Sequence, residues 1–137
     1  MALISIPDVR ERVGAAIFHF DDAPLEKGCV RVIPGSHLDG PREHDPEGSF
    51  HLTEPAFDAA TPLPAEAGDV LLFTYLTVHG SGVNTSDEAR TTWLVQYRDP
   101  ADPPTVKTHD HSRGQGMMLR GVAPAAPHPV PPPPPTD

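Results

Sequence analysis

Cysteine, basic residues and long apolar runs are all scarce in this sequence, and each shortage excludes a class of protein. The single cysteine, Cys29, cannot form a disulfide within the chain, which indicates a reducing compartment such as the cytoplasm. Ten Lys and Arg residues against 19 Asp and Glu give a net charge of −9, whereas nucleic acid or an anionic membrane surface requires a basic patch. No window approaches the roughly 18 apolar residues of a membrane-spanning helix. We therefore predict a cytoplasmic protein with neither a nucleic-acid nor a membrane partner.

The composition limits the size and extent of the folded part. The chain of 137 residues is long enough for one modest domain, and its hydrophobic share of 37% is below the globular average. Many of its 19 prolines gather near the C-terminus, where they form a low-complexity polyproline segment that cannot build a core. We predict a single domain over residues 1–122 and a disordered Pro-rich tail over residues 123–137.

Apolar and β-branched residues recur with a period of two in several short runs, which is typical of strands. Loops rich in Gly, Pro, Asp and Asn separate these runs, and no stretch of more than ten residues has a helical period. Strands are expected at residues 14–20, 29–33, 49–53, 69–75 and 91–98. The pattern predicts an all-β fold of the sandwich or jelly-roll type.

Two side chains flank the polar loop between the last two expected strands. His79 follows the apolar run 69–78 and precedes a Gly-Ser-Gly turn, so its imidazole has room to bind a metal; the alternative is a hydrogen-bonded surface histidine. Arg90 carries five fixed donors that suit bidentate capture of a carboxylate. The alternative for Arg90 is a weak surface ion pair with Asp87 or Glu88.

Three ordered motifs resemble one known family. The segments "EKGCVRVIPGSH" (26–37), "AGDVLLF" (67–73) and "VHGSGVNTSDEARTTWLVQY" (78–97) are similar to those of the phytanoyl-CoA dioxygenase family of Fe(II)- and 2-oxoglutarate-dependent oxygenases. The similarity runs from about residue 17 to residue 118. It implies a double-stranded β-helix, which is a cupin-like jelly roll.

The resemblance also implies chemistry and roles. Family members use Fe(II), 2-oxoglutarate and O₂ to oxidise a small-molecule substrate, usually by hydroxylating a C–H bond. His79 matches the distal histidine of the metal triad, and Arg90 matches the arginine that binds the far carboxylate of 2-oxoglutarate. Ser81 and Asn84 match the loop between them, Ser81 being the second expected cofactor-binding residue. No residue is assigned as a catalytic acid or base.

The other two ligands of the family's triad come from an upstream His-x-Asp motif. Here "HFD" offers His19 and Asp21, but both lie in a later strand, just before Gly28, and we interpret them as a decoy. The family's motif would fall at or before Met1, so we expect a jelly roll that is incomplete at its N-terminus and has little or no turnover by itself. Since His19 and Asp21 share one face of a strand, the alternative that they bind the metal stays open, as does the possibility that His19 faces the cavity without touching metal.

The remaining candidates receive structural interpretations. His37 is expected to fasten its loop or border the substrate entrance, and the "EHD" and "HDH" segments at 43–45 and 109–111 are expected to be solvated. Cys29 is expected to pack as a small buried residue. The alternative function is a catalytically silent, cupin-like module that binds a small ligand without redox metal.

Overall fold

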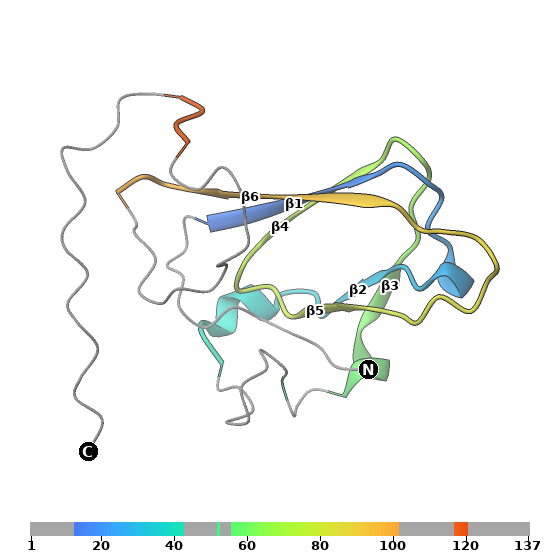
Figure 1. The fold of residues 1–137 in the computed structure, drawn as a ribbon. Coiled ribbons are helices and arrows are strands. Elements are labelled where there is room, and N and C mark those ends of the chain that lie inside the picture. The colour runs from blue at the N-terminus through green and yellow to red at the C-terminus, as the bar shows by residue number, and fades with distance from the viewer. Residues whose placement is uncertain (1–12, 43–51, 53–55, 102–116, 121–137) are drawn as a thin grey trace, which may run out of the picture.

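The fold consists of short strands joined by loops and single turns of 3-10 helix. The computed structural model describes residues 13–42, 52, 56–101 and 117–120 (Figure 1). The strands are β1 (Val13–His19), β2 (Val30–Val32), β3 (Thr61–Leu63), β4 (Val70–Thr74), β5 (His79–Ser81) and β6 (Thr92–Arg98). The 3-10 turns are η1 (Leu25–Lys27), η2 (Ser36–Asp39) and η3 (Phe57–Ala59). No α-helix occurs in these ranges, as the sequence predicts.

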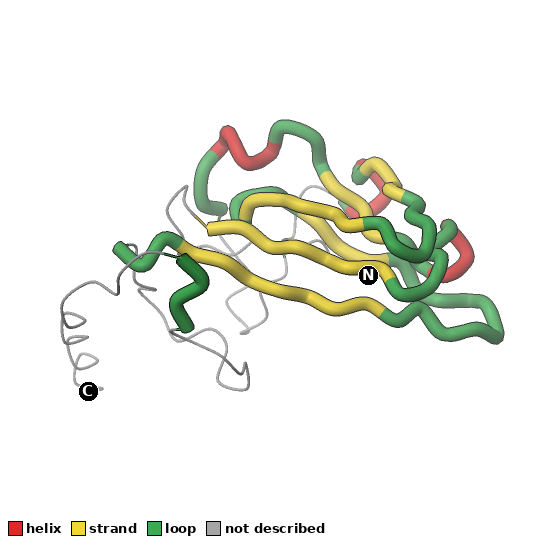
Figure 2. Tube along the Cα trace, turned by 90° about the horizontal axis from the view of Figure 1, so that it is seen from above, coloured by secondary structure: helices red, strands yellow, loops and turns green. Residues whose placement is uncertain are grey.

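The longer strands form one antiparallel sheet in the order β4-β1-β6, whose members run side by side in Figure 2. Ala15 pairs with Phe73 of β4 and with Gln96 of β6, and His19 pairs with Thr92. Partners in an antiparallel pair point to the same face, and alternate residues along a strand point to opposite faces. Ala15 and His19 therefore share a face with Phe73.

The short strands form a second antiparallel sheet in the order β3-β2-β5. Val30 pairs with Ser81, and Val32 pairs with His79. The alternation along β5 places Ser81 on the same face as His79, with Gly80 on the opposite one.

The two sheets form separate layers, seen from the side in Figure 1. A ring contact joins them: the centroids of Phe73 in β4 and His79 in β5 are 4.5 Å apart. The face of the larger sheet that carries Phe73, Ala15 and His19 is therefore the inner face. Ala15 and His19 are both buried there, with exposed fractions of 4% and 2%.

The opposite, outer face of the larger sheet is apolar and open to solvent. Leu72 and Trp93 are 71% and 59% exposed, and Trp93 lies against Phe18 with ring centroids 5.6 Å apart. Along β6 the side chains alternate, so Trp93 points away from the face of Thr92. Leu72 and Trp93 thus contribute little to the buried core.

Four of the five predicted strands are present, and no end differs from its predicted position by more than one residue. The fifth, at 49–53, lies outside the described residues except for Leu52, which is not in a strand. The prediction missed the three-residue strands β3 and β5. The apolar run 69–78 is not one strand, because β4 ends at Thr74 and the chain turns before β5 begins at His79. None of the described residues belongs to a helix long and apolar enough to cross a bilayer.

Candidate functional site

His79 begins β5 with its ring between the two sheets and its side chain half-buried. Its Nδ1 lies 2.7 Å from the carbonyl oxygen of Thr77. Since a carbonyl only accepts, Nδ1 carries the proton and Nε2 keeps a free lone pair. Burial lowers the pKa of His79, which favours the neutral imidazole that can bind a metal. Metal-binding histidines commonly donate their second ring N–H to such a carbonyl.

Ser36 fastens the segment just before His79. Its hydroxyl donates to the carbonyl oxygen of Ile33 at 2.7 Å and accepts the backbone N–H of Val78 at 2.9 Å. Ser36 is 2% exposed, so this hydroxyl is the partner of a buried donor. Sequence reasoning assigned the fastening role in the Pro-Gly-Ser-His turn to His37, whose side chain is exposed. The serine in that turn could have indicated this role, because a small hydroxyl side chain can bond nearby backbone groups.

His19 lies at the end of β1, on the inner face, with 2% of its surface exposed. Its Nδ1 is buried and has no hydrogen-bond partner. Burial is the largest cause that lowers the pKa of His19; the positive charge of Arg90 lowers it further, while the negative charge of Asp69 raises it. His19 is therefore a neutral imidazole with an unused polar atom, within electrostatic range of Arg90.

Arg90 is half-buried and precedes β6 by two residues. Its neighbour Thr91 is held from both sides: Phe20 N–H donates to the Thr91 carbonyl at 3.0 Å, and Thr91 N–H donates to Asp21 Oδ2 at 2.8 Å. These two bonds hold the backbone beside Arg90 against the end of β1. Hydrogen bonds from Thr91 are the largest causes that lower the pKa of Asp21, so its carboxylate is ionised.

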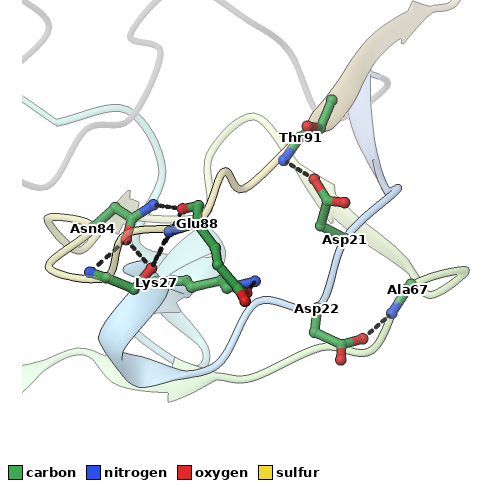
Figure 3. A network of polar contacts seen from close by, with 8 residues as sticks. Asp21, Asp22, Lys27, Ala67, Asn84, Glu88 and Thr91 are labelled. Atoms are coloured by element: carbon green, nitrogen blue, oxygen red, sulfur yellow. Dashed lines mark hydrogen bonds and ion pairs between the residues drawn. The ribbon is translucent and has the colours of Figure 1, made fainter.

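The loop before Arg90 is ordered by its own polar groups (Figure 3). Asn84 Nδ2 donates to the carbonyl oxygen of Glu88 at 2.7 Å, and Asn84 Oδ1 accepts from the backbone and hydroxyl of Ser86. Asn84 is thus a loop-shaping residue. Glu88 forms its ion pair with Lys27, and no ion pair between described residues involves Arg90. The predicted alternative of an Arg90 pair with Asp87 or Glu88 is wrong.

The described residues fit a bound iron only in part. His79 has the tautomer and burial of a metal ligand, but no group of three or more His, Cys, Asp or Glu side chains in the described ranges could hold a metal ion. The carboxylate of Asp21 accepts from Thr91, and His19 lies near a fixed positive charge. Neither arrangement resembles a free ligand pair.

Other candidates have simpler surroundings. Cys29 is a free thiol with 1% of its surface exposed, which confirms its expected burial. Five histidines lie outside the described residues, and so do the segments 43–45 and 109–111. These are His44, His51, His109, His111 and His128.

Comparison with known proteins identifies the chain's relatives. The family described as Phytanoyl-CoA dioxygenase (PhyH) matches residues 3–92, more than half of the chain. The chain belongs to the phytanoyl-CoA dioxygenase family. Phytanoyl-CoA dioxygenase domain-containing protein 1 of Rattus norvegicus is 36% identical over 91 residues, which cover 59% of this chain and 31% of the rat protein. The chain therefore spans about a third of the length of the curated family members that it matches.

Solved structures agree with the family assignment. The epimerase SnoN, solved in complex with Fe3+, alpha ketoglutarate and nogalamycin RO, is 26% identical with a TM-score of 0.58, over 92% of this chain and 56% of SnoN. The non-heme monooxygenase ThoJ has a TM-score of 0.65 at 22% identity, over 77% of this chain and 42% of ThoJ. At that identity ThoJ supports the fold alone. The prediction of an all-β, jelly-roll fold of this family is confirmed.

Proposed function

We propose that this chain carries the cosubstrate-binding half of a non-haem Fe(II)- and 2-oxoglutarate-dependent oxygenase site. The observation that carries the proposal is the hydrogen bond from His79 Nδ1 to the Thr77 carbonyl, which leaves the lone pair of Nε2 free on a half-buried ring between the sheets. In this proposal His79 is one iron ligand, Arg90 binds the far carboxylate of 2-oxoglutarate, and Ser81 shares the face of His79. Bound iron would supply the activation of O₂ for oxidation of a small-molecule substrate.

The two anchors, His79 and Arg90, lie toward different ends of β1. His79 lies against Phe73, which pairs with Ala15, and His19 follows Ala15 by four residues along β1. At about 3.3 Å per residue, Ala15 and His19 are roughly 13 Å apart along the strand. Arg90 lies near the His19 end, within electrostatic range of that imidazole. A buried carboxylate needs a cation beside it, which Arg90 supplies.

The proposed roles make separate predictions for metal and diacid binding. Calorimetry would measure 2-oxoglutarate binding with and without Mn²⁺, a redox-stable substitute for Fe(II). Arg90→Met should weaken 2-oxoglutarate binding by at least about tenfold, and His79→Ala should remove its metal dependence. His37→Ala, on an exposed side chain, is the matched control. Binding of another small ligand without metal, unchanged in His79→Ala, would favour a metal-free module instead.

Turnover by the 137-residue chain is a second, harder test. One imidazole holds iron weakly, so we expect little succinate from 2-oxoglutarate with added Fe(II) and ascorbate. Robust succinate formation that is abolished in His19→Ala would restore His19 and Asp21 as metal ligands.

We further propose the cytoplasm as the compartment, because the one cysteine, Cys29, is buried as a free thiol. The Pro-rich segment 123–137 lies outside the described residues, so its disorder stays a prediction.

A further inference from the structure

We infer that His19 is a second carboxylate-binding residue of this site: its Nδ1 hydrogen-bonds the far carboxylate of the diacid that Arg90 neutralises. This inference rests on the proposed function and adds a residue for which the family motifs give no role. Along β1, His19 is the one inner-face side chain that is both polar and buried, and it lies where β1 is beside Arg90.

The unused polar atom of His19 is the first observation. His19 has only 2% of its surface exposed, and its Nδ1 has no hydrogen-bond partner. A buried polar atom without a partner destabilises the folded state, so such an atom calls for an explanation. The same face of β1 carries Ala15 and Ile17, which shows that apolar side chains fit there.

The backbone groups of His19 are both hydrogen-bonded, and only its imidazole has an atom without a partner. Its backbone N–H donates to the Asp69 carbonyl at 3.0 Å, and its own carbonyl accepts from Gly68 N–H at 2.8 Å. Asp69, the acid whose charge raises the pKa of His19, accepts the N–H of Glu66 at 2.8 Å through Oδ2. Both backbone groups of His19 are therefore hydrogen-bonded, whereas its Nδ1 has no partner within the protein.

The charge balance selects an anion as the missing partner. Arg90 brings a fixed positive charge near His19, and no described acid forms an ion pair with Arg90. A cation would be repelled there, whereas a carboxylate offers about four lone-pair positions. A guanidinium fork fills two of these, and an imidazole N–H can fill a third. A diacid with its far carboxylate between the two side chains satisfies both at once.

The experiment compares two ligands that differ only at the far end. 2-Oxoglutarate and 2-oxopentanoate share a five-carbon 2-oxo acid chain, but the second lacks the far carboxylate. Calorimetry of the full chain with Mn²⁺ would measure both. Wild type should prefer 2-oxoglutarate by at least about tenfold. His19→Leu should weaken 2-oxoglutarate on the order of tenfold and leave 2-oxopentanoate unchanged, since only the far carboxylate loses a hydrogen bond.

A matched pair of variants identifies the nitrogen. In His19→Asn the amide lies near the position of Nδ1, and in His19→Gln it lies near that of Nε2. Retention of 2-oxoglutarate binding within about threefold in His19→Asn, with loss in His19→Gln, would support the Nδ1 assignment. Equal loss in both would overturn it. This pair also decides the question if His19→Leu fails to fold.

The remaining outcomes separate this inference from the proposed function. If wild type binds 2-oxoglutarate, Arg90→Met loses it and His19→Leu keeps it, the role of His19 is wrong and the proposed function stands. If His19→Leu weakens both ligands equally, His19 acts away from the far carboxylate and the inference fails. If wild type binds neither ligand, both proposals fail.

Urea unfolding is an independent measurement. The His19→Leu variant should resist urea at least as well as wild type, because the substitution removes a buried polar atom that has no partner.

Discussion

The imidazole of His79 lies against the ring of Phe73, with the centroids 4.5 Å apart and the ring planes inclined by 54°. Phe73 belongs to the larger sheet and His79 to the smaller one, so this contact crosses the space between the layers. The same imidazole donates to the Thr77 carbonyl. Two independent contacts therefore orient the candidate ligand before any metal binds, which is how a preformed site keeps its affinity.

The Phe73 contact predicts a difference between neighbouring residues of β4. Phe73→Leu should lower the free energy of unfolding by about 1–2 kcal/mol, because it removes an inner-face ring contact. Leu72→Thr is the control: Leu72 is 71% exposed on the outer face, and its replacement should change stability by no more than about 0.5 kcal/mol. Urea denaturation measures both. Equal losses would mean that the two faces of the sheet are not inner and outer as described.

The Ser36 hydroxyl predicts a stability loss tied to the metal ligand. Ser36→Ala leaves the buried N–H of Val78 without its partner, which should cost about 1–3 kcal/mol in the free energy of unfolding. Because Val78 precedes His79, the same variant should weaken Mn²⁺ binding in the presence of 2-oxoglutarate. His37→Ala, at the next residue, should change neither quantity. Full stability in Ser36→Ala would show that Val78 is satisfied in another way.

Two glycines at a close backbone approach predict a steric effect. Gly28 has a φ of +70°, and a Cβ there would collide with the Gly82 carbonyl, while a Cβ on Gly82 would lie 2.8 Å from Gly28 Cα. Gly35 has a similar φ of +80° with nothing within 4 Å of an added Cβ. Gly35→Ala should therefore cost about 1 kcal/mol from backbone strain alone. Gly28→Ala should cost about 1–3 kcal/mol more by thermal or urea unfolding, and equal costs would remove the steric argument.

The longer elements of the fold follow from sequence patterns because their periodicity is sustained. The run around Thr92–Arg98 alternates over seven residues, and its pairing with β1 keeps that parity. The three-residue strands β3 and β5 could not be predicted in the same way, since three residues do not establish a period. β3 even contains Pro62, which argues locally against a strand.

The candidate site also has a part that sequence patterns predict and a part that they do not. His79 and Arg90 are recognisable because motifs and spacing surround them on one continuous segment. The approach of His19 to Arg90 depends on the pairing of β1 with β6. Beyond the last paired residues, the N–H of Phe20 donates to the carbonyl oxygen of Thr91, which is 71 residues later in the sequence. Side-chain parity places His19 on the inner face, but only the sheet order shows which cation lies beside it. Ser36 was missed for a similar reason, because its partner Val78 lies in another motif.

His19 and His79 together predict a pH dependence of stability. Burial is the largest cause that lowers the pKa of both His19 and His79 below 6.5. The unfolded chain therefore binds more protons than the folded one as pH falls below about 6.5, so folded stability is full above that pH and decreases below it. Urea unfolding of wild type should show a falling free energy of unfolding between about pH 6.5 and pH 5. His19→Leu should flatten this slope, because an apolar residue takes no proton. Parallel slopes in wild type and His19→Leu would mean that His19 can protonate without unfolding the chain, and would place it closer to solvent than its 2% exposure indicates.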